Sequence, residues 1–141
     1  MKTHTAKWWS VDIPDTWQIE PARDYVRFAA DAGVSMRVTC LRKERGITSE
    51  AELEAYAVPF LGEAYGRYAV STLGMVGFVL DCPSQSGTGS RQIAYLGSGR
   101  LMFIVTAEVS QGKKDEVKKN LETLLAALKP NDEESEEASQ T

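Results

Sequence analysis

Two-residue alternation of apolar and polar side chains is the feature that most restricts how this chain can fold. In residues 34–40 every second side chain is apolar or a small thiol, namely Val34, Met36, Val38 and Cys40. The residues between them are polar, so the segment has the period of a strand with one buried face. Residues 9–13 show the same period. These segments predict a β-sheet that packs against a core, and we expect Trp9 and Trp17 to lie in that core.

Residues 24–29 form a further β-prone segment, and residues 31–33 after it have the composition of a tight connection. Residues 68–80 are rich in β-branched and aromatic side chains, but Gly74 and Gly77 interrupt them. Glycines within strands mark bulges, bends or close backbone approaches, so we expect such a feature here.

Residues 92–96 and 101–109 are predicted to be two strands of a hairpin, joined by the glycine-containing residues 97–100. Residues 101–105 are apolar on both faces, which favours a place in the middle of the sheet. The small and polar residues 83–90 predict an exposed loop.

A helix is predicted to begin at Ser49, whose hydroxyl can cap it, and Glu52 is placed to complete a capping box. Its apolar side chains recur at helical spacing on one face: Leu53, Ala57, Phe60, Leu61 and Ala64. Pro59 lies inside this helix. Because proline lacks a backbone N–H and clashes with the preceding turn, we expect a kink or a break near Val58.

A second amphipathic helix is predicted over residues 115–129, ended by Pro130. Its apolar stripe consists of Val117, Leu121, Leu124, Leu125 and Leu128. Residues 131–141 contain no large apolar side chain and much negative charge, so they cannot bury enough surface to offset their ordering entropy. With 141 residues the chain can bury a core without a disulfide or a metal. We expect one domain over residues 1–130 and an acidic disordered tail over 131–141.

The order of these elements is three strands, a helix, three strands and a closing helix (βββ-α-βββ-α). This order predicts an α+β fold in which helices flank an antiparallel β-sheet of about six strands. It argues against a doubly wound fold, in which strands and helices alternate along the chain.

The sequence carries few of the side chains that nucleophilic catalysis requires. Its one histidine, His4, lies in a polar segment and is interpreted as a mobile, solvated bystander. The carboxylates of Asp12 and Asp15 are typical of a turn. Those of Glu50 and Glu52 suit a helix start, where the helix dipole favours negative charge. We therefore expect no enzymatic activity, no cofactor and no metal site.

Two further motifs have simple structural interpretations. Residues 86–91 are rich in glycine and serine but lack the Gly-Lys-Ser/Thr ending of a phosphate-binding loop, so a flexible hairpin loop is predicted. Cys40 and Cys82 are too few for a disulfide framework or a thiolate zinc site. A buried thiol is the favoured interpretation of Cys40, and one disulfide between the two cysteines is the alternative.

The formal net charge of -4 and the pI of about 5.1 bear on the choice of partner. Because duplex binding relies on clustered Lys and Arg, nucleic acid is not expected as a partner. The sequence has no apolar stretch long enough to span a membrane, and residues 1–7 do not resemble a signal peptide. We expect no membrane insertion and a cytoplasmic location.

Four residues are candidates for an interface with a partner: Trp8, Arg42, Lys43 and Arg45. Strand alternation points Trp8 away from Trp9, so it either meets a helix on the second face or stays exposed as an interface anchor. The three basic side chains form a small patch beside a strand end. A solvated loop explains this patch, and contact with an acidic partner or with the chain's own acidic tail is the alternative.

Residues 9–17, WSVDIPDTW, form an extended start that ends in a Pro-x-x-Trp turn. This opening resembles that of PsbP-like and DcrB-like domains. The likeness continues in the order of the elements that follow: a strand pair, a helix near 51–64, glycine-containing strands, a hairpin at 97–99 and a closing helix. The resemblance covers nearly all of the chain before the tail. It implies an antiparallel sheet with helices on both faces. It also implies a function in binding, as in photosystem extrinsic subunits, nuclear-import factors that bind Ran, and Eag-type chaperones for type VI secretion effectors. It assigns no functional residue here, because the histidines of the metal sites in some PsbP proteins are missing.

Our leading hypothesis from the sequence is a non-catalytic binding or adaptor protein, in one version a chaperone that docks a partner segment on the sheet face or on Trp8. The alternative is a small-ligand-binding protein or an enzyme with a pocket between the sheet and the helix that Pro59 interrupts. Formation of a homodimer through an exposed strand edge is a third hypothesis.

Overall fold

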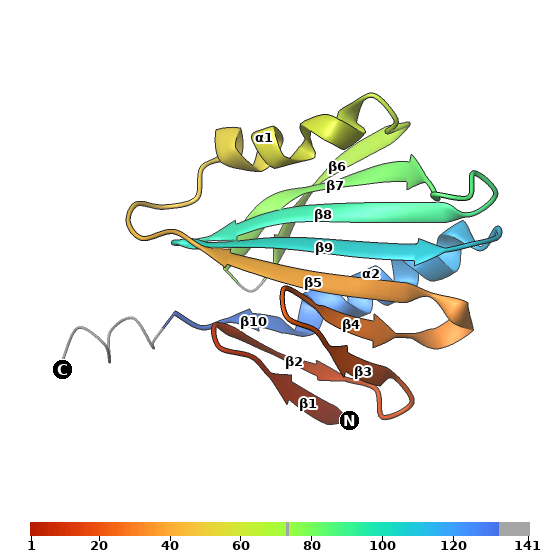
Figure 1. The fold of residues 1–141 in the computed structure, drawn as a ribbon, viewed down its shortest axis with the longest axis horizontal. Helices are drawn as coiled ribbons and strands as arrows, with labels where there is room; N and C mark the ends of the chain where they lie inside the picture. The colour runs from red at the N-terminus through yellow and green to blue at the C-terminus, as the bar shows by residue number, and fades with distance from the viewer. Residues whose placement is uncertain (73, 133–141) are drawn as a thin grey trace.

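The computed structural model describes residues 1–72 and 74–132, which form an α+β fold of two antiparallel sheets and two helices (Figure 1). The strands are β1 (Lys2–Thr5), β2 (Trp9–Ile13), β3 (Gln18–Pro21), β4 (Val26–Ala29), β5 (Ser35–Arg42), β6 (Gly66–Thr72), β7 (Met75–Pro83), β8 (Ser90–Ser98), β9 (Leu101–Val109) and β10 (Leu128–Pro130). The helices are α1 (Glu50–Leu61) and α2 (Lys114–Ala127), and a short 3-10 turn, η1 (Asp31–Gly33), precedes β5. The predicted antiparallel sheet flanked by helices is confirmed.

The large sheet has seven strands in the order β3-β4-β5-β9-β8-β7-β6, and every neighbouring pair is antiparallel. β9 is its middle strand, as the run of apolar residues in the sequence predicts. Phe103 of β9 pairs with Cys40 on one side and with Leu96 on the other. The small sheet has three strands in the order β1-β2-β10.

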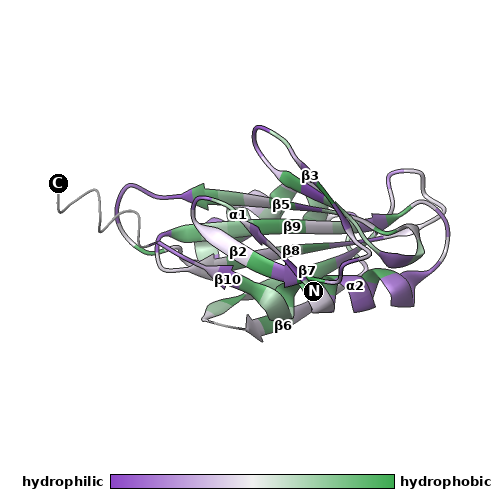
Figure 2. Ribbon diagram, turned by 90° about the horizontal axis from the view of Figure 1, so that it is seen from below, coloured by the Kyte–Doolittle hydropathy of each residue, from purple (hydrophilic) through white to green (hydrophobic). Residues whose placement is uncertain are grey.

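The two helices lie on opposite faces of the large sheet (Figure 1). We call the face that carries α1 the front face and the face that carries α2 the back face. The main core lies on the back face, where α2 and the small sheet cover it. Its largest buried side chains include Trp17, Phe28, Met36, Phe103 and Leu121. In Figure 2 green apolar segments run along the central strands, whereas the loops at both ends are largely purple.

The predicted buried positions are confirmed by this core. Trp9, Met36 and Val38 belong to the same cluster as Leu121, with 4% or less of each side chain exposed. Trp17 is buried as well. One face of each alternating segment therefore packs into the core that α2 covers, which is the arrangement that a period of two residues specifies.

The helix α1 begins with the predicted capping box. The Glu52 N–H donates to Ser49 Oγ at 3.2 Å, and the Ser49 N–H donates to Glu52 Oε1 at 3.1 Å. Of the kink or break predicted near Val58, the break is wrong, because the helix continues through Pro59 to Leu61. Pro59 lies in the last turn, so its missing N–H removes one backbone hydrogen bond close to a helix end, where few remain to be disrupted.

The large sheet has seven strands where about six were predicted, and the order along the chain is five strands, α1, four strands, α2 and β10. Residues 68–80 do not form one strand. They contribute to the hairpin of β6 and β7, and Gly74 in its turn has φ of 80°, a backbone conformation that glycine adopts without strain. The second helix stops at Ala127, since Leu128 turns into an extended conformation and pairs with Val11.

The described chain continues two residues past the predicted domain boundary at residue 130. The Asn131 N–H donates to the Trp8 carbonyl at 2.6 Å, which extends the alignment of β10 with the N-terminal strands. The rest of the predicted disordered tail, residues 133–141, lies outside the described residues. Neither α1 nor α2 has the length and apolar character of a membrane-spanning helix.

The N-terminal strand β1 corrects the interpretation of His4 as a mobile bystander. β1 pairs with β2, and the imidazole of His4 lies 5.5 Å from the Trp9 ring and 6.2 Å from the Phe28 ring, measured between centroids. The polar sequence of β1 hid this strand, because β1 is held by pairing with β2 and by the ring contacts of His4, which local periodicity does not show. Partial burial lowers the pKa of the His4 imidazole below its usual value.

We predict that His4 makes the protein less stable in mildly acidic solution. The folded state binds a proton at His4 less readily than the unfolded state, so the unfolding free energy falls as the pH drops from about 7.5 to about 5.5. His4 is the only histidine, so His4→Asn should flatten this part of the curve. Urea unfolding of both proteins across this range measures the effect. An equal slope in the variant would contradict the prediction.

Candidate functional site

The helix α1 covers only one half of the front face. Its buried residues Leu53 and Ala57 pack on side chains of β7, β8 and the start of β9, including Phe78, Tyr95 and Met102. A helix of this length spans about 18 Å at 1.5 Å per residue, so a single α1 cannot shield a seven-stranded sheet. No other described helix lies on this face.

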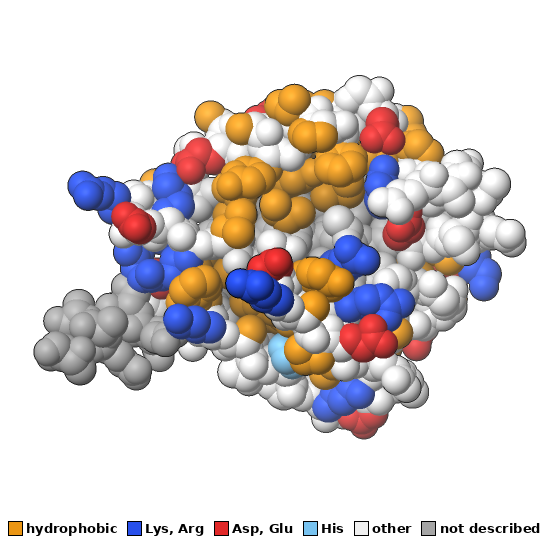
Figure 3. Space-filling model, viewed as in Figure 1, with side chains coloured by type: hydrophobic (Ala, Val, Ile, Leu, Met, Phe, Trp, Pro, Cys, Tyr) orange, Lys and Arg blue, Asp and Glu red, His pale blue; other side chains and the backbone are white. Residues whose placement is uncertain are grey.

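The uncovered half of the front face is formed by β5 and β9, and we call it the open face. Its side chains alternate with those that enter the core of the back face: Ser35, Arg37, Thr39 and Leu41 of β5, and Ile104, Thr106 and Glu108 of β9. Figure 3 shows apolar side chains in a band directly below α1, with basic side chains further down the same face. The open face therefore combines an apolar strip with charged groups.

A groove of about 320 Å³ runs between the open face and the C-terminal end of α1. Phe60 forms its wall on the helix side. Thr39, Ile104 and Thr106 form part of its floor, and Tyr25, which precedes β4, lies at the far side. The predicted location of a pocket, between the sheet and α1, therefore does hold a groove, although α1 is not interrupted.

The guanidinium of Arg91 on β8 is the most buried charged group in this groove. Only 9% of the side chain is exposed. Its Cζ lies 5.2 Å from the centre of the Phe60 ring, and its Nη2 lies 3.6 Å from Glu63 Oε1. Its Nε has no hydrogen-bond partner among the described residues. A buried donor without a partner is uncommon, because desolvation of a charged group is costly.

A second guanidinium, that of Arg37, lines the same groove from β5. Arg37 is exposed and stacks on the Tyr25 ring at 4.7 Å. Glu108 is the one carboxylate that lines the groove, and its Oε2 accepts a hydrogen bond of 2.8 Å from the Gln85 N–H. The groove thus contains two cations and one acid that is already engaged.

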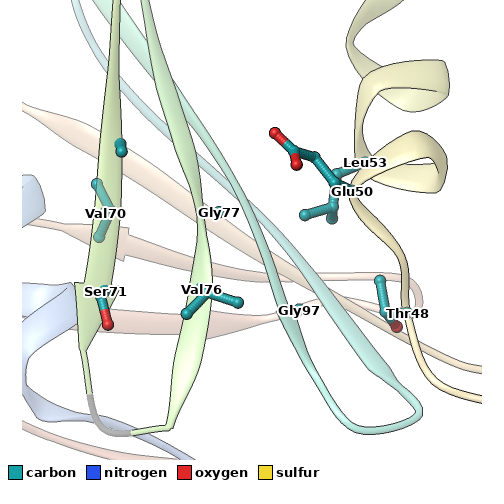
Figure 4. A pocket seen from close by; sticks show the side chains of 9 residues that line it. Thr48, Glu50, Leu53, Val70, Ser71, Val76, Gly77 and Gly97 are labelled. Atoms are coloured by element: carbon teal, nitrogen blue, oxygen red, sulfur yellow. The ribbon is translucent and has the colours of Figure 1, made fainter.

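A second and more apolar cavity, of about 420 Å³, lies at the N-terminal end of α1 (Figure 4). Residues of the loop before α1, of α1 itself and of strands β6, β7 and β8 line it, including Leu53, Val70, Val76 and Gly97. The Glu50 side chain extends from the start of α1 toward β7 and is the one carboxylate among the lining residues. Val76 is 60% exposed, so this cavity opens to solvent at the edge of the sheet.

The four residues predicted as an interface are only partly brought together. Trp8 is half-buried against the back-face core, and the Arg42 guanidinium lies 5.6 Å from its ring. Lys43 instead faces the start of α1, where its Nζ lies 2.7 Å from Glu52 Oε1. Arg45 is exposed in the loop. Trp8 is thus partly buried, which lies between the two alternatives of contact with a helix and full exposure.

The basic patch does contact the beginning of the predicted tail. Arg42 Nε donates to Asp132 Oδ1 at 2.6 Å, and Arg100 Nε donates to Asp132 Oδ2 at 3.3 Å. The chain's own acidic tail was one of the predicted partners of this patch. Asp132, the second residue of that tail, makes this contact. Arg42 is therefore engaged within the chain.

The two cysteines are free and lie on opposite faces of the large sheet. Cys82 is buried beneath α1, whereas Cys40 packs at the rim of the back-face core. Burial raises the pKa of Cys40 to about 12 and also raises the pKa of Cys82. Both remain protonated thiols at neutral pH, so neither has the character of an activated nucleophile.

The predicted carboxylate pairs have local partners. Asp12 accepts hydrogen bonds from Thr3 and Lys129, and these contacts lower its pKa. Asp15 contacts the N-terminal amine at 3.1 Å. The Lys43 ammonium and the capping box lower the pKa of Glu52. Among residues 1–72 and 74–132 no group of three His, Cys, Asp or Glu side chains has an arrangement suited to a metal ion.

The glycine-rich residues 86–91 end in a strand and not in a helix, as expected for a hairpin loop. The hydroxyls of Ser86 and Thr88 donate to the Ser110 carbonyl, which holds the loop against the end of β9. In the sequence, Arg91 stands only as the last residue of this motif. The signal that could have distinguished it is its place in β8, where alternation turns it toward the front face.

No family model matches this chain, and no curated protein matches it. Among the solved structures that resemble it is a crystal structure from Bacteroides thetaiotaomicron VPI-5482 at 1.50 Å resolution. The two share 16% sequence identity with a TM-score of 0.66, over 94% of this chain and 49% of the other. This chain thus spans about half the length of that protein. At this identity the likeness shows the fold alone.

Proposed function

We propose that this chain is a non-catalytic binding protein that docks an extended segment of a protein partner on the open face. The observation that carries the proposal is that α1 covers half of the front face and leaves a groove beside it. The resemblance to PsbP-like domains, many of which act by binding, favours the same class of function. Membership of the PsbP-like fold group is part of this proposal.

The shape and composition of the open face favour a chain segment as its ligand. The apolar band below α1 follows the direction of the helix (Figure 3). Leu41, which is 37% exposed, lies toward one end of β5, and the polar groove with Arg37 lies toward the other. An apolar strip with polar groups around it is the usual composition of a protein interface. Alternate side chains of an extended segment can enter it.

We predict that Thr39→Arg abolishes binding of the partner. Thr39 forms part of the groove floor, so a long charged side chain there fills the groove. In a pull-down from the source cell, the wild-type chain should retain a specific protein, and Thr39→Arg should retain it about tenfold less. Hydrogen exchange of the complex should show protection in β5 and β9.

Thr5→Arg is the matched control, because Thr5 is exposed on β1 of the small sheet. This variant should retain the partner as well as the wild type does. The proposal fails if the folded wild-type chain retains no specific protein. It also fails if Thr39→Arg and Thr5→Arg bind the partner equally.

A second candidate function is small-ligand binding in the apolar cavity at the N-terminal end of α1. Its volume of about 420 Å³ lies within the range of known ligand pockets. A thermal-shift screen against a metabolite library separates the two candidates. A large shift with one compound that Val76→Trp abolishes would favour this function, and a flat profile would count against it.

A further inference from the structure

The unpaired Nε of Arg91 is the feature of the groove that the fold itself does not explain. Structural arginines in a protein interior normally donate to a carbonyl or a carboxylate. Here 9% of the side chain is exposed, and the Nε lacks an acceptor among the described residues. The Nε itself is shielded from solvent, but the guanidinium lines an open groove, so an acceptor from outside the chain can reach the part of the side chain that stays exposed.

The acidic neighbours of Arg91 do not supply that acceptor. Glu63 Oε1 lies 3.6 Å from Nη2, which is beyond hydrogen-bond distance, and the Glu63 side chain is 49% exposed. Glu108 pairs with Arg91 across the strands β8 and β9. Its Oε2 accepts the Gln85 N–H at 2.8 Å instead. Both acids reduce the positive charge of the groove without satisfying the Nε.

Other donors surround the same space. Arg37 contributes a second guanidinium, held in place by its stacking on Tyr25 at 4.7 Å. Thr106, which pairs with Arg37 across β5 and β9, and Thr39 line the floor of the same groove. An incoming group that accepts hydrogen bonds can therefore be held by charged donors on β5 and β8.

We propose that Arg91 and Arg37 form a binding site for a carboxylate group. A planar carboxylate matches the fork of a guanidinium, which donates two parallel hydrogen bonds to it. A single negative charge suits the groove better than a phosphate dianion, since Glu63 and Glu108 repel additional charge. The carboxylate is either an acidic side chain or chain end of the docked segment, or a free small carboxylate. The first source rests on the proposed function, and the second does not.

The test follows the Nε–Hε signal of Arg91 by NMR in the full chain, assigned from its loss in Arg91→Lys. The probes are acetate, inorganic phosphate, and a capped pentapeptide of valine and threonine with a central glutamate or glutamine. We expect acetate and the glutamate peptide to shift the signal saturably. The glutamine peptide should bind about tenfold more weakly than the glutamate peptide, and phosphate about tenfold more weakly than acetate.

Variants identify the cations involved. Arg91→Gln, which lacks the Arg91 signal and is therefore followed by the Nε–Hε signal of Arg37, should weaken binding of the glutamate peptide about tenfold. Arg37→Gln, followed by the Arg91 signal, should weaken it about threefold. Arg45→Gln is the control, because Arg45 is exposed in the loop before α1, outside the groove. If Arg91→Gln does not fold, the wild-type signal and Arg37→Gln still decide the outcome.

Several results would overturn the carboxylate site. These are an Arg91 signal that none of the probes moves, equal losses in Arg37→Gln and Arg45→Gln, or phosphate binding as tight as that of acetate. If acetate shifts the signal and the two peptides bind equally, the ligand is a free carboxylate. That result supports the site. If the acetate shift persists while Thr39→Arg leaves partner retention unchanged, the site stands and the proposed docking function fails.

Discussion

Gly77→Ala is expected to destabilise the fold by about 3 kcal/mol or more, a large part of the total stability of a small domain. A Cβ at Gly77 would lie 1.8 Å from the carbonyl oxygen of Tyr95 and 2.9 Å from its carbonyl carbon. These are backbone atoms of the neighbouring strand and cannot rotate away. β7 and β8 would have to separate along the pairing that places Gly77 opposite Leu96. Urea unfolding followed by tryptophan fluorescence measures the loss.

Gly62→Ala provides the matched control for this substitution. Gly62 follows α1 with helical φ and ψ of -72° and -22°, and a Cβ there meets no atom within 4 Å. Alanine should therefore leave the stability unchanged or raise it by up to about 1 kcal/mol. A Gly77→Ala protein whose stability is within about 0.5 kcal/mol of the wild type would contradict the proposed close approach of the strands.

Phe103→Ala should cost about 3 to 5 kcal/mol of unfolding free energy. Phe103 is fully buried in the middle strand of the large sheet, and its side chain belongs to the cluster that α2 covers. Truncation removes an aromatic ring where strands on both sides and a helix prevent the structure from collapsing into the space. Denaturant unfolding should give a lower midpoint with an unchanged slope.

Ile104→Ala is the control in the adjacent position. Ile104 points to the front face and is only partly buried, since no helix covers β9 there. Its truncation should cost about 1 kcal/mol, because part of the side chain is already in water. Equal losses at Phe103 and Ile104 would mean that the two faces of β9 are buried alike, contrary to the described packing.

The sequence pattern predicted the large sheet well because its strands are specified locally. The apolar positions of residues 34–40 and 101–109 indicate which face of each strand is buried. The capping box of Ser49 and Glu52 indicates where α1 begins. β1 and β10 were not predictable in this way. β1 contains only polar side chains, and β10 follows a helix without a turn signal. Both exist because β2 offers an edge on each side.

The candidate site was harder to predict because it depends on pairing between distant strands. The basic residues near Trp8 stood out in sequence as a cluster, yet Arg42 and Lys43 have acidic partners within the chain. Arg91 and Arg37 are 54 positions apart by number, and only the neighbouring places of β5, β9 and β8 bring them to one groove. The periodicity of a segment indicates which face of its strand is buried, but it does not indicate which other strands will pair with it.

The small sheet makes the two ends of the domain depend on each other during synthesis. Lys129 of β10 contacts Asp12 of β2, 117 positions earlier in the chain. A ribosome that adds about 5 to 20 residues per second needs roughly 6 to 23 s to cover that distance. During this interval one edge of β2 has no strand beside it and can pair with another nascent chain. Chaperone protection of newly made protein would matter most in this period.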